Sequence, residues 1–326
     1  MSTTTDNPND IRITRIYDAP LALVWEAWTD VEQVAQWWGP RGFTITTHSK
    51  DFRAGGTWVY TMHGPDGIDW PNFTRYHEVV PQARLVYDHG ASAEGAAPMF
   101  QVTATFRDLG GKTELVMIMT LPTADAAKQT RVHIKAAGGN ATWDRLAEYL
   151  AQRVSAQEVF VIARTFDAPI TTVFDMWTSP DHFSAWLPPA GFSMSVLRGE
   201  ISEGSATLIA MTNGDIVMHV RQSYRQLQRP ALLEYAQTFT DIDGNDARQP
   251  GAPAWPVTTL VTVQFVEETP TRTRVAVRFT IDGTVTAAEV DAFVAERAGM
   301  TTGWNASFDV LDEVLTRVTN ASSMPR

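Results

Sequence analysis

Five polar residues in the first half of this 326-residue chain have the types and spacing needed for chemistry. Tyr60, Tyr76, Glu78, Tyr87 and His89 lie where apolar and polar residues alternate, so we expect them on or near the apolar, inward face of a sheet. A few polar groups in apolar surroundings are typical of a ligand pocket, and a carboxylate or imidazole there could transfer protons. The alternatives are packing for the tyrosines and an exposed strand carboxylate for Glu78. His89 stands near a strand end, so for this residue we favour the alternative of a solvated loop position. Glu78 and His89 are therefore weak catalytic candidates.

The sequence lacks the intact motifs of several other kinds of site. The run His77-Glu78-Val79-Val80-Pro81 begins like a zinc-protease motif, but proline replaces the second histidine, and a strand cannot supply the helical spacing. Gly204-Ser205-Ala206 lacks the frame of a nucleophile elbow. There is no phosphate-binding loop, no dinucleotide fingerprint and no cysteine. We predict no metal site and no cofactor.

Apolar residues on the same strand faces complete the predicted pockets. In the first half, the pocket candidates are Trp38, Phe43, Trp58, Tyr60, Met62, Tyr76, Glu78, Leu85, Tyr87, His89, Phe100, Val102, Met117, Met119 and Trp143. In the second half, they are Met211, Tyr224, Tyr235, Val277, Phe279 and Phe308. Core packing is the alternative for each of them, and for the methionines above all.

The chain contains two copies of one pattern. Asp167-Ala168-Pro169 stands 149 positions after Asp18-Ala19-Pro20 (167 − 18), and Trp186 stands at the same offset from Trp37. Because each copy is long enough to bury its own core, we predict two domains, 8–153 and 157–320, joined by a short link at 153–158. The shared Trp37 and Trp186 are predicted to anchor the short helices on the sheet. Trp38 is replaced by Leu187 and is a candidate for a cavity mouth.

Each copy follows the same order of predicted elements. A strand over 11–17 precedes a short helix with Val24 and Trp28 at helical spacing, and Thr29-x-x-Glu32 predicts a capping box for a second helix. About six strands of period two follow, and the copy closes with a helix whose Trp143 and Leu146 share one face. The order predicts an α+β fold in which a curved antiparallel sheet wraps around a long C-terminal helix.

Local motifs add a resemblance. Trp37-Trp38-Gly39-Pro40-x-Gly42-Phe43, Asp51-x-Arg53-x-Gly55-Gly56 and Tyr76-x-Glu78-Val79-Val80-Pro81-x-x-Arg84-Leu85 resemble the bacterial homologues of the activator of heat-shock protein 90 ATPase. This branch belongs to the START-like, birch-pollen-allergen-like (SRPBCC) superfamily. The resemblance implies two tandem helix-grip domains, each with an apolar cavity between the sheet and the long helix. It covers the first copy closely and the second more loosely.

Differences between the copies suggest where function lies. Glu78 becomes Gln226 and His89 becomes Gln237, whereas the apolar framework is kept. Two hypotheses follow: the first copy holds the functional pocket, or the two pockets bind different ligands.

Three functions are consistent with these observations. The resemblance implies binding of a small hydrophobic ligand, lipid-like or polyketide-like, mainly in the first domain. It also implies two alternatives: a cyclase-, aromatase- or hydrolase-type enzyme using the same cavity, and a co-chaperone that contacts a heat-shock chaperone. The net charge of −11 argues against a nucleic-acid partner. No apolar run is long enough to span a membrane and no secretory signal is present, so we expect a cytoplasmic protein.

Overall fold

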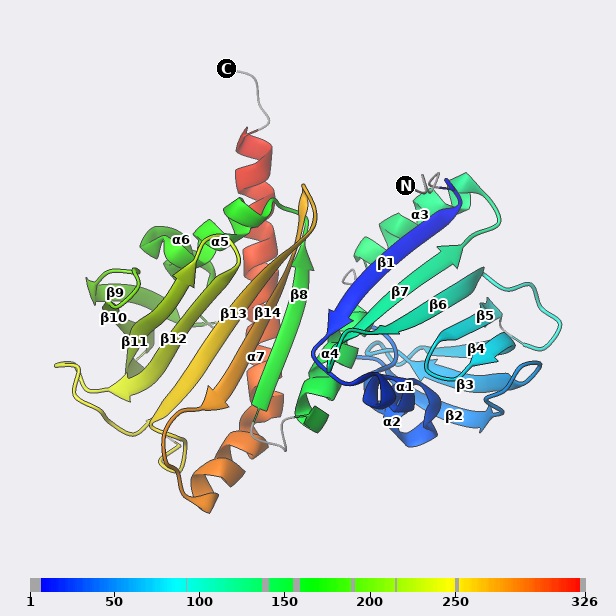
Figure 1. Ribbon diagram of the computed structural model, residues 1–326. Helices are drawn as coiled ribbons and strands as arrows, with labels where there is room; N and C mark the ends of the chain where they lie inside the picture. Colours follow the sequence, from blue (N-terminus) through cyan, green and yellow to red (C-terminus); the bar gives the residue numbers. More distant parts are fainter. Residues whose placement is uncertain are drawn as a thin grey trace. The chain divides into compact units, whose positions relative to one another are not determined.

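The chain forms two compact units, Met1–Val154 and Ser155–Arg326. The computed structural model describes residues 7–91, 93–136, 141–154, 159–188, 191–214, 216–249 and 252–322 (Figure 1). Residues 155–158 of the predicted link lie outside these ranges.

The first unit is built on an antiparallel sheet, which has seven strands within the described ranges, in the order β1-β7-β6-β5-β4-β3-β2. The strands are β1 (Asp10–Tyr17), β2 (Thr44–Lys50), β3 (Thr57–His63), β4 (Asp69–Val80), β5 (Arg84–Ala91), β6 (Phe100–Asp108) and β7 (Thr113–Thr120). Two short helices, α1 (Leu21–Thr29) and α2 (Val31–Trp37), follow β1, and α3 (Ala124–Ala136) and α4 (Ala141–Val154) follow β7. Alternate residues of β7 are buried, as expected for a sheet with one apolar face.

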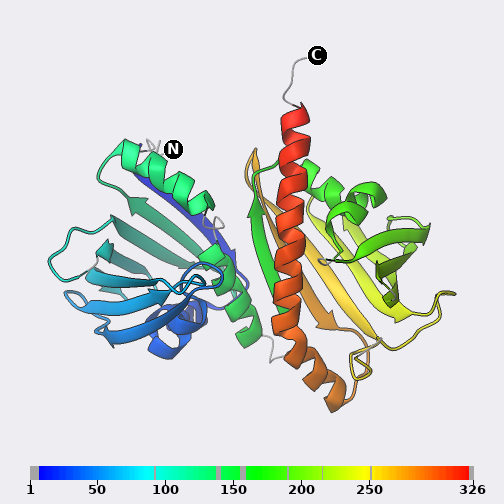
Figure 2. The same ribbon diagram turned by 180° about the vertical axis from the view of Figure 1, so that it is seen from behind.

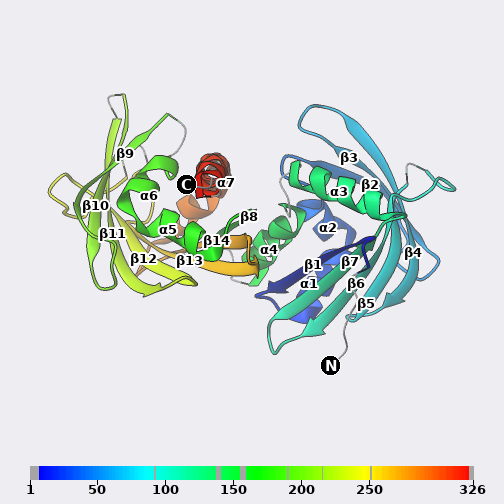
Figure 3. The ribbon, with the colours of Figure 1, turned by 90° about the horizontal axis from the view of Figure 1, so that it is seen from above.

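The second unit repeats this plan, with strand order β8-β14-β13-β12-β11-β10-β9. Its strands are β8 (Val159–Phe166), β9 (Ser193–Gly199), β10 (Ala206–Asn213), β11 (Ile216–Gln228), β12 (Leu232–Thr240), β13 (Thr258–Thr269) and β14 (Arg272–Ile281). Its helices are α5 (Ile170–Thr178), α6 (Pro180–Trp186) and α7 (Ala287–Ser322). Figure 2 shows α7 lying along the sheet, and Figure 3 looks almost down its axis, with α5 and α6 on the same side.

The predicted α+β helix-grip fold is confirmed in both units, with one difference in the first. A single long helix closes the second unit, whereas α3 and α4 close the first. Helix α3 was not predicted, because its sequence, ADAAKQTRVHIKA, has good helix formers but little apolar periodicity. The predicted face of α4 is correct, since Trp143, Leu146 and Leu150 are all buried.

The two short helices are held in the same way in both units. The indole Nε1 of Trp37 donates a hydrogen bond of 3.0 Å to the carbonyl of Ala27, and that of Trp186 donates one of 2.9 Å to Met176. These bonds join α2 to α1 and α6 to α5, whereas the predicted anchoring was to the sheet. The capping prediction was wrong by one residue: Asp30, not Thr29, caps α2, because its carboxylate can accept from two backbone N–H groups.

Strand β4 departs from simple alternation. The register of its pairing with β5 shifts between Phe73 and Arg75, and again between Tyr76 and Glu78. These β-bulges leave Phe73, Thr74 and Tyr76 buried on one short stretch. Bulges re-aim side chains, and here they decide which residues of β4 point inward.

Within its described residues, the chain has no helix that is long and apolar enough to cross a membrane.

Candidate functional site

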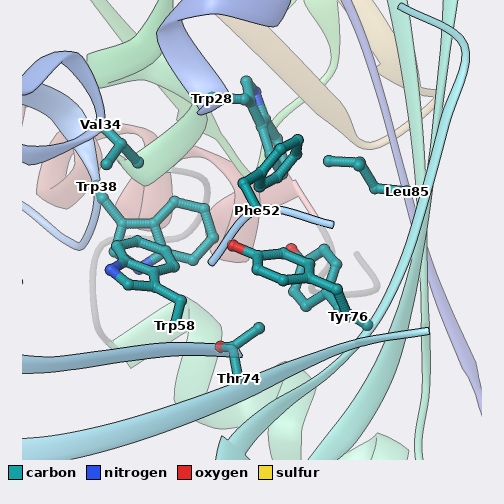
Figure 4. A pocket seen from close by; sticks show the side chains of 9 residues that line it. Trp28, Val34, Trp38, Phe52, Trp58, Thr74, Tyr76 and Leu85 are labelled. Carbon is teal, nitrogen blue, oxygen red and sulfur yellow. The ribbon is translucent and has the colours of Figure 1, made fainter. Parts of the chain in front are cut away.

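A small apolar pocket lies between the short helices and the sheet of the first unit. Its lining residues are Trp28, Val34, Trp38, Phe52, Trp58, Thr74, Tyr76, Leu85 and Tyr87. The cavity has a volume of about 10 Å³, which is enough for about one water molecule. The pocket is therefore almost filled by its own aromatic side chains (Figure 4).

Several elements supply these side chains. Helix α1 contributes Trp28, α2 contributes Val34, and Trp38 is the residue that ends α2. Phe52 follows β2, Trp58 lies on β3, and the others come from β4 and β5. Figure 4 shows the Tyr76 ring between Phe52 and Thr74, with its hydroxyl directed toward the indoles of Trp38 and Trp58.

Trp38 is fixed by one side-chain hydrogen bond. Its Nε1 donates to the Tyr60 hydroxyl at 3.1 Å, and the Tyr60 ring stacks on Trp58 with centroids 4.0 Å apart. Burial raises the pKa of Tyr60 well above its usual value, although the hydrogen bond from Trp38 partly offsets this. Tyr60 is therefore a neutral phenol that accepts from Trp38.

The backbone that follows Trp38 is held by one arginine of α4. Arg145 Nη1 donates to the carbonyls of Gly39 and Pro40, both at 2.9 Å, and to that of Phe43 at 3.2 Å. Its Nη2 donates to the carbonyl of Gln36 at 3.2 Å. Arg145 thus connects α4 to the turn that carries Trp38, and burial, together with the nearby Arg41, lowers its pKa.

The hydroxyls of Tyr76 and Tyr87 stay protonated in this pocket. Burial raises the pKa of both phenols above the usual value, and each neighbouring phenol adds to the effect. Both tyrosines can therefore donate hydrogen bonds to a bound molecule, but they do not supply phenolate.

The expectation that His89 is a solvated loop residue is wrong. It lies within β5, its ring centroid is 5.0 Å from that of Phe100 and 6.0 Å from that of Trp38, and its Nδ1 is buried. Among the residues that the structure describes, this nitrogen has no hydrogen-bond partner. Burial lowers the pKa of His89 to about 4, so the imidazole is neutral near pH 7.

Glu78 lies outside the pocket. The bulge after Tyr76 turns its side chain outward, where it is 44% exposed and its Oε2 lies 3.3 Å from Nε of Arg84. The inward placement was therefore wrong, because simple alternation fails at a bulge. The exposed-carboxylate alternative describes it correctly.

The remaining candidates of the first unit lie around the pocket. Tyr60, Val102, Met117, Met119 and Trp143 belong to the surrounding buried core, and Met62 and Phe100 pack against that core while partly exposed. Phe43 is half-buried, and its carbonyl accepts from Arg145.

The structure adds four lining residues that the sequence analysis did not choose, Trp28, Val34, Phe52 and Thr74. Trp28 and Val34 are at helical spacing within their helices, which signals burial but not which cavity they face. Thr74 lies two residues before Tyr76 and pairs with Trp58, so alternation places it on the same inward face.

The candidates of the second unit form a packed core. Tyr224, Tyr235, Val277, Phe279 and Phe308 are buried, and Met211 packs against them. The Tyr224 hydroxyl lies 3.0 Å from Thr207 Oγ1 and donates to Gln222 Oε1 at 3.1 Å, so its polar group is paired inside the unit. Burial raises its pKa to about 12.

The described residues contain no cluster of three or more histidine, aspartate or glutamate side chains that could hold a metal ion.

The sequence of both copies matches one protein family. The family described as activator of Hsp90 ATPase homolog 1-like protein matches residues 18–151 and 167–316. The chain belongs to this family. The resemblance seen in the motifs of the first copy is thus confirmed, and it extends to the second.

Solved structures are similar to one unit or to the whole chain. A protein from Nitrosomonas europaea is 24% identical, with 46% of this chain and 99% of that chain covered and a TM-score of 0.42. The di-domain ARO/CYC BexL from the BE-7585A biosynthetic pathway is 14% identical, with 94% and 98% covered and a TM-score of 0.39. DynU16 from the dynemicin biosynthetic locus is 17% identical, with 94% and 99% covered and a TM-score of 0.32. A search of curated proteins finds no match.

Proposed function

We propose that the first unit binds a small hydrophobic molecule of one or two rings in the pocket around Trp38. The observation that carries this proposal is the lining, in which aromatic and aliphatic side chains surround a few hydroxyl groups. Ligand pockets usually combine such an apolar wall with a few polar groups that fix orientation. The buried Nε1 of Trp28 and Nδ1 of His89, which have no partner among the described residues, are further groups that a ligand could satisfy.

The size of the ligand follows from the side chain that it must displace. The free space suits about one water molecule, so a ligand must displace a side chain. Trp38 is the best candidate, because one side-chain hydrogen bond fixes its ring and Gly39, with φ of 98°, follows it. Arg145 holds the backbone of this turn, so the indole can rotate while the turn stays in place. The vacated space has the size of an indole.

The second unit lacks the features that distinguish this pocket. Leu187 stands in place of Trp38, Thr207 in place of Trp58, and Gln237 in place of His89. Its buried Tyr224 is paired with neighbouring side chains. These differences favour the first unit as the binding unit.

Calorimetric titration with a neutral two-ring probe, 2-naphthalenemethanol, tests the proposal. We expect one molecule to bind per chain, and we expect Leu85→Trp to abolish binding by filling the pocket. Leu233→Trp, at the equivalent buried position of the second unit, is the matched control and keeps binding. Thermal unfolding of each variant verifies that it is folded. Absence of binding to the wild-type chain, or equal loss in both variants, contradicts the proposal.

A second candidate function is acid–base chemistry on the bound molecule. One observation favours it: the neutral imidazole of His89 presents a buried Nδ1 with no partner among the described residues. An imidazole in that state can accept a proton from a bound ligand, as cyclisation or aromatisation requires. A substitution of His89 separates the two functions, because it should affect turnover by an enzyme more than binding of a ligand. His89→Gln, the residue found in the second copy, should abolish turnover of a polyketide-like substrate by an enzyme while leaving 2-naphthalenemethanol bound.

A further inference from the structure

Lys50 lies at the edge of the pocket and its ammonium contacts pocket-lining residues. Nζ donates a hydrogen bond of 2.9 Å to the carbonyl of Trp28, and it lies 4.6 Å from the ring centroid of Trp58 and 5.6 Å from that of Phe52. All three of these residues line the pocket. In the described part of the first unit, the other cation–ring contact is Arg75 with Phe73, which is not a lining residue.

The environment of this ammonium is poor in acceptors. An ammonium has three N–H donors, and the described hydrogen bonds assign one of them, to Trp28. Lys50 packs against α1, α2 and β3. Of the charged groups on these elements, Asp30 at the start of α2 acts on it and raises its pKa, but burial lowers it more, to about 8. A second anionic oxygen beside Nζ would offset that burial.

The second unit cannot place a cation here. Lys50 pairs with Trp58 in the sheet of the first unit, and Gly199 pairs with Thr207 at the equivalent place in the second. Gly199 has φ of 93°, and a Cβ at this position would lie 1.9 Å from the carbonyl oxygen of Ala206. No side chain fits there, so the ammonium and the ring beneath it are features of the first unit alone.

We propose that Lys50 binds the carboxylate of an aromatic or other apolar acid whose hydrophobic body enters the pocket. This inference rests on the proposed function and specifies the chemical class of its ligand. A single ammonium beside a backbone carbonyl matches one negative charge, whereas a phosphate dianion calls for more donors. The carboxylate accepts from Nζ, and the hydrophobic body lies against the rings of Trp58 and Phe52, which line the pocket and contact the ammonium.

Calorimetry with matched probes tests this. 2-Naphthoate carries the carboxylate, 2-naphthalenemethanol is its neutral counterpart, and 2-naphthyl phosphate carries the dianion. At about pH 7 we expect naphthoate to bind roughly tenfold to a hundredfold more tightly than the alcohol, as for a charge-assisted hydrogen bond, and more tightly than the phosphate. Lys50→Met should remove the preference for naphthoate. Lys112→Met, an exposed lysine paired with Asp18, is the charge-matched control and should keep it.

The pH dependence of naphthoate affinity reports the charge of Lys50, which a purely packing role of this side chain would not do. Naphthoate affinity should be constant from about pH 6 to the pKa of Lys50 and then fall about tenfold per pH unit, because the ammonium loses its proton. Affinity for the alcohol should stay flat. Lys50→Arg, whose side chain remains charged, should keep naphthoate bound and remove the pH dependence.

The outcomes separate this inference from the proposed function. If naphthoate and the alcohol bind equally, or if the naphthoate preference survives in Lys50→Met, Lys50 does not bind the carboxylate and the pocket proposal stands. If the phosphate binds most tightly, the assignment to a carboxylate is wrong. If none of the three probes binds to the wild-type chain, both proposals fail.

Discussion

The indole of Trp38 donates a hydrogen bond of 3.1 Å to the hydroxyl of Tyr60, and this bond fixes the orientation of a ring that lines the pocket of the first unit. Both side chains are buried. The second unit has Leu187 and Ile209 at these positions, so it cannot form the bond. The bond is therefore a feature of the first unit that the second unit lacks, although both keep one fold.

Removing the hydroxyl should weaken the first unit. Tyr60→Phe leaves the Trp38 N–H buried without an acceptor, so the free energy of unfolding should fall by about 1–3 kcal/mol. Urea unfolding of Tyr60→Phe, Trp38→Phe and the double variant measures this in a mutant cycle. A coupling energy near zero would show that the hydrogen bond contributes nothing.

Trp38→Ala should create a space that accepts indole. Loss of a buried tryptophan should cost about 3–5 kcal/mol of unfolding free energy, and an apolar cavity of this kind can bind a small aromatic molecule. We expect indole to raise the unfolding temperature of this variant. Leu187→Ala, its counterpart in the second unit, is the control and should gain less. No response to indole would mean that the pocket collapses.

Arg145 should be needed to hold the turn after Trp38. Its guanidinium donates from Nη1 to carbonyls of the turn and from Nη2 to the carbonyl of Gln36 in α2, a geometry that lysine cannot reproduce. Arg145→Lys and Arg145→Met should both lower the free energy of unfolding, by about 1–3 kcal/mol for the methionine variant. Arg12→Met, an exposed arginine of β1, should change it little. Equal effects at both positions would refute the role of Arg145.

His89 should make stability depend on pH in the acid range. Its pKa is about 4 in the folded chain and 6.5 when unperturbed, so the unfolded chain binds more protons between these values. Stability should therefore be complete above about pH 6.5 and fall as the pH drops toward 4, by up to about 3 kcal/mol from this group. Urea unfolding of the wild type and His89→Gln at several pH values measures the difference. Parallel curves would show that His89 does not contribute.

Sequence patterns predicted the fold well because they repeat and are long. The period-two segments and the tryptophans at a 149-residue offset gave the sheets and the anchored short helices of both units. The pocket was harder, since alternation predicts a face only while the register is unbroken. The bulge after Tyr76 turns Glu78 outward, although alternation places it on the inward face.

Individual environments were the hardest to predict. His89 was expected to be solvated because it is polar and near a strand end, but Trp38 and Phe100 pack against it. Lys50 at the end of β2 has the sequence context of an exposed strand terminus, and only the carbonyl of Trp28 and the ring of Trp58, distant along the chain, reveal its position.

The most direct test of the central claim is native mass spectrometry of the chain purified gently from its own host, compared with its denatured mass. We expect a discrete additional mass on the wild-type chain, absent from Leu85→Trp and retained by Leu233→Trp. A wild-type chain without additional mass, which also takes up nothing from a hydrophobic extract, would contradict ligand binding by the first unit.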